Sequence, residues 1–270
     1  MPTSIFTLSL SLAVLTLSLS ACQQEDTVAL STDTDSWFCQ TADYPFTYSV
    51  CRVNASALTS ARYSLQLFWQ SANSAQPLLT FDGLLTALPE DKTLNFAMNA
   101  GMYDERYAPI GYTIIEGKEV KSLNLKEGGG NFHLLPNGVM WWDKAGNVQI
   151  TESNALNEQI NNGDVQPWYA TQSGPMLVIN DEIHPQFNSD SSSVKLRNGA
   201  GVCTDGSIQF VNSDAPVTFY QFAELFKDEL GCPNALFLDG GIASALYAPS
   251  IDKQDKKEMG VMIGLVENKE

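Results

Sequence analysis

The chain has 270 residues, and its 31 Asp and Glu against 15 Lys and Arg give a formal net charge of −16. Hydrophobic residues make up 44% of the chain, which is enough to bury a core and too many for a disordered protein. The acidic charge argues against general binding to nucleic acid or to anionic membranes, because both would be repelled.

The N-terminal residues 1–21 resemble the signal peptide of a bacterial lipoprotein. An uncharged apolar run from Ile5 to Ala21 ends directly before Cys22. An ordinary signal peptidase site needs a small residue where Leu19 stands, so we expect cleavage before Cys22 and lipid attachment to its thiol. One departure is that no Lys or Arg precedes the apolar run. The alternative is a transmembrane anchor, for which about 17 residues would be marginal.

The remaining chain divides into two parts. Residues 22–36 are polar and are expected to form a tether between the lipid and the folded protein. Residues 37–270 contain no internal repeat and no Pro/Ser-rich linker, and we expect them to form one domain. A lipid-anchored, exported protein would face the bacterial cell envelope and would touch a membrane only through its lipid.

Short alternating segments with turn residues between them predict a β-rich domain. Residues 61–70 place Tyr63, Leu65, Leu67 and Trp69 on one face, as in a half-buried strand. Further strands are expected at 46–53, 93–98 and, fully apolar and therefore central, 235–238. Hairpins are expected at 112–121, 132–142, 175–184 and 200–211, the second turning at Asn137-Gly138.

Few helices are indicated. The clearest follows Thr218, which forms a capping box with Gln221, and it ends at Gly231. A short helix is also expected at 242–246. The fold class is therefore α+β: a single β-rich domain whose mixed or antiparallel sheet is built of hairpins, with a few packed helices.

Four cysteines remain after Cys22 is assigned to the lipid. Disulfides are expected in an oxidising compartment, and four cysteines allow three connectivities. The pairing of sequence neighbours is Cys39–Cys51 and Cys203–Cys232. None of the four has the spacing of a metal site, and no metal or other cofactor is indicated.

Four polar, glycine-containing segments lie at strand ends, where a β-rich scaffold places its site. We call them the Asn99 segment (99–103), the Glu127 segment (127–132), the Gln172 segment (172–175) and the Asp239 segment (239–244). Each alone is weak evidence, since such residues often form turns.

Together, the four segments resemble the phosphodiester glycosidase family. The resemblance rests on GGGNFHLLPNGV, ATQSGPML, KLRNGAGV and NALFLDGGIAS, and it covers about residues 93–248. One departure is Ala243 directly before Ser244. The family includes the lysosomal enzyme that removes N-acetylglucosamine from a phosphodiester to leave mannose 6-phosphate. The resemblance implies a hydrolase that cleaves the C1–O bond of a sugar-1-phosphodiester, without a cofactor.

Such a reaction passes through an oxocarbenium-like state and needs a carboxylate to activate water or to act as nucleophile. Asp239 is the leading candidate, with an Asx turn as its structural alternative. Glu127 is the second carboxylate, unless it is simply solvated. Arg197 is expected to bind the phosphate; its alternative is a surface ion pair. Asp239, Glu127 and Arg197 are thus the catalytic candidates.

The substrate-binding candidates are polar side chains and glycines of the same four segments. Main-chain N–H groups near Gly240 and Gly241 are expected to face an anion at a helix start. Polar side chains in the other segments suit sugar hydroxyls. The full set is Asn99, Gly101, Asn131, Ser173, Gly174, Gly240, Gly241 and Ser244.

Several other residues are given structural roles. His133 and His184 have no relay partner in the sequence and are expected to be structural or exposed. Trp141 and Trp142 point to opposite faces of a strand, so at least one is expected in the core. Residues 252–258 are expected to form a solvated loop.

Two other functions remain open. One is a lipoprotein that binds glycan without cleaving it. The other is a metal-dependent phosphodiesterase that uses Asp239 and Glu127 as ligands and breaks the P–O bond. The sequence does not define the sugar, the aglycone or the anomer.

Overall fold

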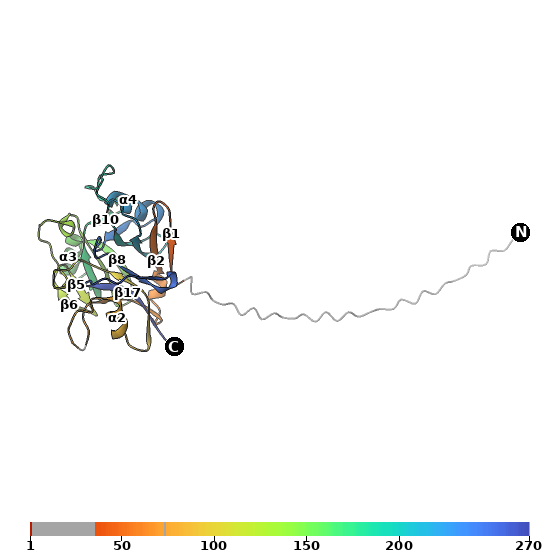
Figure 1. The fold of residues 1–270 in the computed structure, drawn as a ribbon, viewed down its shortest axis with the longest axis horizontal. Helices are drawn as coiled ribbons and strands as arrows, with labels where there is room; N and C mark the ends of the chain where they lie inside the picture. Colours follow the sequence, from red (N-terminus) through yellow and green to blue (C-terminus); the bar gives the residue numbers. More distant parts are fainter. Residues whose placement is uncertain (2–35, 73, 270) are drawn as a thin grey trace. The chain divides into compact units, whose positions relative to one another are not determined.

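The computed structural model describes Met1, residues 36–72 and residues 74–269 (Figure 1). The expected signal peptide (1–21), Cys22 and the tether up to residue 35 lie outside the described residues. In the part of the chain that is described, no helix has the length and apolar character needed to cross a membrane.

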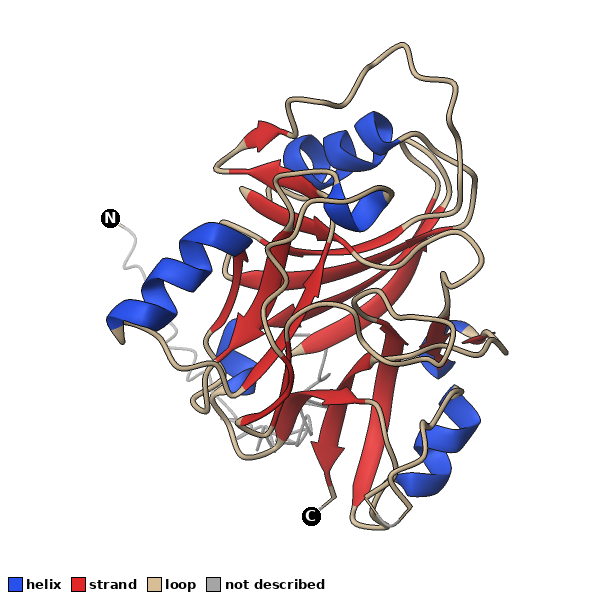
Figure 2. Ribbon diagram, turned by 90° about the vertical axis from the view of Figure 1, so that its left-hand side faces the viewer, coloured by secondary structure: helices blue, strands red, loops and turns tan. Residues whose placement is uncertain are grey.

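Three antiparallel sheets form the domain, with the helices on its outside (Figure 2). The seven-stranded sheet has the order β1 (Trp37–Ala42), β2 (Tyr48–Asn54), β13 (Ser207–Ser213), β12 (Asn198–Val202), β14 (Asn234–Phe237), β10 (Met176–Ile179), β11 (Glu182–Ile183). A five-stranded sheet has the order β16 (Lys253–Gln254), β15 (Leu246–Ala248), β4 (Lys92–Asn99), β17 (Met262–Asn268), β3 (Tyr63–Phe68). The other five-stranded sheet has the order β6 (Lys118–Lys121), β5 (Thr113–Ile115), β9 (Tyr169–Ser173), β7 (Gly138–Trp142), β8 (Val148–Glu152). The α+β, β-rich prediction is confirmed.

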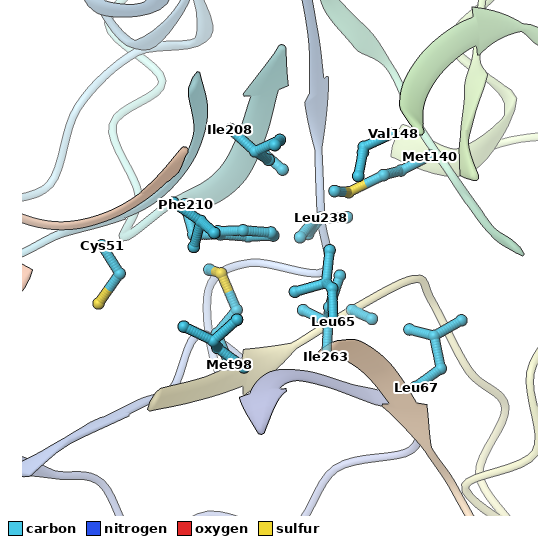
Figure 3. Packing of buried hydrophobic residues seen from close by; sticks show 14 of the residues in the cluster. Cys51, Leu65, Leu67, Met98, Met140, Val148, Ile208, Phe210, Leu238 and Ile263 are labelled. Atoms are coloured by element: carbon cyan, nitrogen blue, oxygen red, sulfur yellow. The ribbon is translucent and has the colours of Figure 1, made fainter. Parts of the chain in front are cut away.

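One hydrophobic core joins the three sheets. It contains Leu65 from β3, Met98 from β4, Met140 from β7 and Phe210 from β13 (Figure 3). The rings of Phe96 and Phe210, from two different sheets, lie 5.3 Å apart. Because protein cores are closely packed, this core holds the strand ends, and therefore the loops that follow them, in fixed positions.

The strands whose patterns were clear form as predicted. In β3, Tyr63, Leu65 and Leu67 are buried and alternate with less buried residues. The apolar β14 lies between β12 and β10 in the interior of its sheet. The hairpins β5–β6, β10–β11 and β12–β13 are also confirmed.

The expected hairpin at 132–142 is wrong. Residues Asn131–His133 form the 3₁₀ helix η2, while β7 pairs with β8 and β9. Gly138 begins β7, and the Asn137 side chain donates a hydrogen bond of 2.8 Å to the Phe132 carbonyl. The Asn-Gly pair therefore closes a helical turn against the start of a strand and does not reverse the chain.

The capped helix is confirmed as α4 (Phe219–Glu224), which continues as the π-helical η3 (Leu225–Glu229). The Thr218–Gln221 capping box is present, and Gly231 follows with φ of 64°. The other helices are α1 (Ala55–Leu58), α2 (Phe81–Ala87), α3 (Ser153–Asn162) and the 3₁₀ helix η4 (Pro249–Ile251).

The short helix expected at 242–246 does not form. Leu246 begins β15, and residues 239–245 form an irregular loop with Gly241 at φ of 67°. The Ala245 N–H donates to the Asn99 side chain at 3.0 Å. A bond to another strand therefore replaces the bond that this amide would make within a helix.

Both expected disulfides are present. Cys39–Cys51 joins directly opposite positions of β1 and β2. Cys203–Cys232 joins the residue after β12 to the segment that follows η3.

Candidate active site

The structure brings the four polar segments together in one chain of contacts. The Asp239 N–H donates to the Ala100 carbonyl at 3.0 Å, which joins the Asp239 segment to the Asn99 segment. A Cβ added to Gly101 would lie 2.4 Å from the Gln172 carbonyl oxygen, and one added to Gly174 would lie 3.2 Å from the Asn131 carbonyl oxygen. Both glycines are therefore required for close backbone approach.

Asn99 is the buried centre of this arrangement. Its Nδ2 donates a hydrogen bond to the Asp239 carbonyl. Its Oδ1 accepts bonds of 3.0 Å from Asn198 Nδ2 and from the Ala245 N–H. Both ends of the 239–245 loop are thus held by one amide from the end of β4. The expected contact of Asn99 with a sugar hydroxyl stays a prediction, because its amide is engaged within the protein.

The Asp239 carboxylate is partly buried and makes no hydrogen bond or ion pair with any described residue. Burial raises the pKa of Asp239 to about 6. Burial, and then the negative charge of Asp239, raise the pKa of Tyr103 to about 12, so the phenol and this carboxylate interact electrostatically. The result is a carboxylate in a poorly solvated position with a neutral phenol near it, a setting that suits acid–base or nucleophilic chemistry.

Arg197 is buried, with 3% of its surface exposed, and so it is not the partner in a surface ion pair. Its Nε donates to the Val217 carbonyl at 2.9 Å and its Nη2 to the Ser193 carbonyl at 3.2 Å. The guanidinium lies 3.5 Å from the centre of the Phe219 ring. Burial lowers the pKa of Arg197 to about 10, which leaves the side chain positively charged at neutral pH.

Arg197 lines a cavity of about 150 Å³ together with Leu134, Gln186 and Phe219. No acidic side chain of the described chain forms an ion pair with the guanidinium. A buried cation with no neutralising partner, next to a cavity, is a candidate site for an anionic group.

Phe237 lies between Arg197 and the Asp239 segment. Its ring centre is 5.8 Å from the Arg197 guanidinium, and a Cβ on Gly240 would come within 2.6 Å of the same ring. The Gly241 N–H donates to the Leu196 carbonyl at 2.8 Å. One aromatic ring therefore contacts both the guanidinium and the backbone of the Asp239 segment, and no ion pair of the described residues joins Arg197 to Asp239.

The expected helix N-terminus at Gly240-Gly241 is wrong. No helix begins there, and the Gly241 N–H is used by Leu196, as described above. Ser244 is buried, and its hydroxyl accepts a 3.0 Å hydrogen bond from Asn212 Nδ2. These residues position the Asp239 segment, and their expected contact with substrate stays a prediction.

The residues of the Gln172 and Glu127 segments differ in how far they are buried. Ser173 is buried, and its hydroxyl has no hydrogen-bond partner in the described chain. Asn131 is exposed, as is Glu127, which lies on the loop before η2. No hydrogen bond or ion pair of a described residue joins the Glu127 carboxylate to Asp239, so its catalytic role stays a prediction.

Residues 252–258 are largely solvent-accessible, as the sequence suggested, and include the short strand β16, but several of their side chains also contact neighbouring segments. Lys257 Nζ donates to the Ser244 carbonyl at 2.6 Å, and Asp255 Oδ2 accepts from the Leu246 N–H at 2.8 Å. Glu258 accepts a 2.5 Å hydrogen bond from the Tyr107 hydroxyl. Lys257 and Asp255 therefore support the end of the Asp239 loop, next to the Ala245 N–H that Asn99 accepts.

The histidines and tryptophans occupy structural positions. His184 is buried and stacks on Phe187, with ring centres 4.6 Å apart, and burial lowers its pKa. The His133 Nδ1 is hydrogen-bonded to the Lys126 carbonyl at 2.8 Å. Trp141 and Trp142 are both buried, in different hydrophobic clusters, as expected for opposite faces of one strand.

Sequence reasoning missed three residues that shape the site: Tyr103, Asn198 and Lys257. Tyr103 belongs to the Asn99 segment and Asn198 follows Arg197, so both were adjacent to residues already selected. Nothing local distinguished Lys257 from the other lysines around it. Among the described residues, no three His, Cys, Asp or Glu side chains are grouped in a way that could hold a metal ion.

Comparison with known proteins shows the family of the chain. The sequence model of the phosphodiester glycosidase family matches residues 92–266, which include Asn99, Arg197 and Asp239. The chain belongs to the phosphodiester glycosidase family. It is 35% identical over 202 residues to the uncharacterized protein YigE of Escherichia coli K12, which covers 72% of this chain and 76% of YigE.

Solved structures share the fold of this family member at low identity. The zebrafish N-acetylglucosamine-1-phosphodiester alpha-N-acetylglucosaminidase catalytic domain, auto-inhibited by its pro-peptide, has a TM-score of 0.57 at 14% identity; the match covers 85% of this chain and 81% of that one. A hypothetical protein from Synechocystis has a TM-score of 0.60 at 14% identity. The match covers 86% of this chain but only 62% of the Synechocystis chain. A Burkholderia pseudomallei protein named for its expected export has a TM-score of 0.53 at 10% identity, and the match covers 81% of this chain and 73% of that one.

Proposed function

We propose that this protein is a hydrolase that cleaves the glycosidic C1–O bond of a sugar-1-phosphodiester in an envelope or extracellular glycan. The observation that carries the proposal is the Asp239 carboxylate, which is raised in pKa by burial and held at the meeting point of the polar segments. Family membership supports glycosidase-type activity.

Asp239 and Arg197 would have different roles in this reaction. The bond breaks between C1 and the phosphate oxygen, and its electrons leave with the phosphate, which departs as a monoester. The Arg197 cation would stabilise that developing charge. Because phosphate is a good leaving group, little protonation is needed. Asp239 would accept the proton of the attacking water or form a glycosyl intermediate that water then opens.

The test is hydrolysis of a panel of methyl esters of sugar 1-phosphates, including that of N-acetylglucosamine, by the full chain purified in detergent. We expect turnover by the wild type and a loss of at least about 100-fold in Asp239→Asn. Asp252→Asn is the matched control, because Asp252 is exposed and lies outside the site. Turnover that survives in Asp239→Asn would overturn the assignment of Asp239.

Running the same reaction in ¹⁸O-labelled water separates the two hydrolytic alternatives. Label in the sugar product means cleavage of the C1–O bond, as proposed. Label in the phosphate product means cleavage of the P–O bond and would favour a phosphodiesterase. Glycan binding with no turnover on the whole panel would favour the non-catalytic alternative.

We further propose that Cys22 carries a lipid and that the domain acts on the exported side of a bacterial membrane. The sequence at residues 1–22 and the two disulfides, which form in oxidising compartments, support this location. Expression of the wild type and of Cys22→Ser, followed by membrane fractionation and mass spectrometry, tests it. Recovery of both proteins in the same fraction with equal mass would contradict lipid attachment.

A further inference from the structure

A second cavity, of about 240 Å³, lies away from the polar segments. Trp142 and Tyr169, which line it, are opposite each other at one end of the paired strands β7 and β9. At the other end of the same pair, Gly138 lies opposite Ser173 of the Gln172 segment. Four residues at about 3.3 Å each separate the two ends by roughly 13 Å. The cavity is therefore distinct from the residues around Asp239 and Arg197.

Aromatic side chains form one wall of this cavity. The rings of Trp142 and Tyr169 are stacked with their centres 5.1 Å apart. The Trp142 indole N–H donates to the Leu65 carbonyl at 3.0 Å, which fixes the stack against β3. Trp168, directly before Tyr169 in the chain, also lines the cavity and is only partly buried, whereas Trp142 and Tyr169 are 3% and 6% exposed, so Trp168 supplies most of the accessible aromatic surface of this wall.

The rim beside Trp168 is polar. Glu116 is exposed in the turn between β5 and β6, and this turn is held against Trp168 by a 2.7 Å hydrogen bond from the Gly117 N–H to the Trp168 carbonyl. A Cβ on Gly117 would lie 2.7 Å from the Trp168 ring, so the turn approaches the ring as closely as a glycine allows. Lys144 Nζ lies 4.9 Å from the same ring.

The rim offers both hydrogen-bond donors and acceptors. The Trp168 indole N–H has no hydrogen-bond partner among the residues that the structure describes. Gln66 Nε2 is bound to Ser64 at 2.7 Å, which leaves the Gln66 carbonyl oxygen to accept. The Glu116 carboxylate is hydrogen-bonded to the Tyr169 side chain and has further lone pairs that can accept, and Lys144 is a donor.

The charges of the rim select against an anion. Two carboxylates, Glu116 and Asp143, line the cavity with one ammonium group, Lys144. Asp143 is already engaged by the Asn147 N–H at 3.0 Å and by the Ala145 N–H at 2.9 Å, and these bonds keep it ionised. A phosphate group would meet net negative charge here, in contrast to the cation at Arg197.

We propose that this cavity binds an uncharged pyranose unit of a glycan, at a site separate from the one around Asp239. A pyranose presents C–H groups on its faces and hydroxyls at its edge, which match an aromatic wall beside a rim of mixed donors and acceptors. Binding a second sugar unit would retain a glycan near the protein between reactions, through effective concentration. The inference does not depend on whether Asp239 is catalytic.

The test uses ligand-observed NMR titration of the full chain in detergent with three probes: methyl α-D-glucopyranoside, N-acetylglucosamine and glucose 6-phosphate. We expect saturable, millimolar binding of at least one neutral sugar, and at least about 10-fold weaker binding of glucose 6-phosphate at the cavity, counted as the binding that Trp168→Ala removes. Trp168→Ala should weaken the neutral sugar by at least about 10-fold, because it removes the open ring of the wall.

Trp168→Ala removes a large side chain, so a conservative variant is needed to separate a loss of binding from a loss of folding. Glu116→Gln keeps the shape of an exposed side chain, and it should weaken binding about 5-fold, because a carboxylate accepts a stronger hydrogen bond than an amide. Glu119→Gln, on the same hairpin but outside the cavity, should bind as the wild type does. Asp239→Asn should also bind as the wild type does.

Three results would overturn the inference. The first is no saturation with either neutral sugar. The second is binding that is unchanged in both Trp168→Ala and Glu116→Gln. The third is binding that is lost in Asp239→Asn but retained in the two cavity variants, which would place the sugar at the proposed active site. Loss of hydrolysis in Asp239→Asn with sugar binding intact would leave both proposals standing, so the two fail independently.

Discussion

The side chain of Asn99 holds the main chain of Asp239: its Nδ2 donates to the Asp239 carbonyl while its Oδ1 accepts the Ala245 N–H at 3.0 Å. Asn99 ends a strand that packs in the core, and Asp239 begins an irregular loop. The position of the proposed catalytic carboxylate therefore depends on a buried amide that is distant in sequence.

Asn99→Ala is expected to damage both stability and activity. It would leave the Asp239 carbonyl and the Ala245 N–H unpaired in a buried place, at a cost of about 2–4 kcal/mol, and the loosened loop should lower kcat by at least about 10-fold. Urea unfolding and initial rates measure the two effects. Asn95→Ala is the matched control in the same strand, since Asn95 makes only a 3.4 Å contact to Glu267. Equal effects of the two variants would show that Asn99 has no special role.

The pH dependence of activity should follow the Asp239 carboxyl. A base or nucleophile works in its ionised form, so kcat/KM for a diester should rise through pH 6, where the pKa of Asp239 lies, and level off above it. The diester has no group that titrates in this range. An inflection that stays near pH 4 would contradict a buried Asp239 as the ionised catalytic group.

Stability should change with pH in the opposite direction. Burial raises the pKa of Asp239 from 3.8 to about 6 in the folded state, so the folded protein binds the proton more tightly than the unfolded chain. The resulting stabilisation is complete below about pH 4 and is lost as the pH rises through 6, a change of up to about 3 kcal/mol. Asp239→Asn should therefore be more stable than the wild type at pH 8, as measured by urea unfolding. A variant that is less stable at pH 8 would show that the carboxylate is stabilised by a partner.

The parts of the fold that sequence predicted are those set by local chemistry. The alternation of Tyr63, Leu65 and Leu67 and the Thr218–Gln221 capping box depend on neighbouring residues alone, and both are present. The loop after Asp239 was read as a helix because its residues permit one. It is irregular because the side chain of Asn99, 146 residues away, accepts the Ala245 N–H, while Lys257 donates to the Ser244 carbonyl.

In the site, too, local features could be predicted from the sequence and contacts between distant residues could not. The four polar segments could be selected from their composition and order, and the structure joins them. The role of each residue within these segments depends on contacts between different sheets, which the sequence does not show. Asn99, at the end of β4, contacts Asp239, which follows β14, although these two strands belong to different sheets.

The Cys203–Cys232 disulfide should contribute to stability through the chain between its ends. It closes a loop that contains β13, α4 and η3, with a sequence separation of 29. The double variant Cys203→Ser/Cys232→Ser is expected to lose about 2–4 kcal/mol. Comparison of urea midpoints with the oxidised wild type measures this loss. The same double substitution at Cys39 and Cys51, whose separation is 12, should cost less; a larger cost there would contradict the loop-length argument.

Arg197→Lys tests whether this buried cation recognises phosphate. Lysine retains the charge but loses the planar fork that donates to the Val217 and Ser193 carbonyls and stacks on Phe219. We expect KM for a sugar-1-phosphodiester to rise about 10- to 100-fold, because one or two charge-assisted hydrogen bonds to the phosphate are lost. Arg52→Lys, which alters an ion pair with Asp205 on an exposed surface, should leave KM unchanged.

An uncharged aryl glycoside of the same sugar distinguishes recognition from structural damage by Arg197→Lys. It has no phosphate to contact the guanidinium, so its hydrolysis should change less than about 3-fold if Arg197 acts on phosphate. An equal loss on both substrates would mean that the substitution disturbs Phe237 and, through its contact with Gly240, the Asp239 segment. In that case Arg197 would be a positioning residue for Asp239, and the phosphate would be recognised elsewhere.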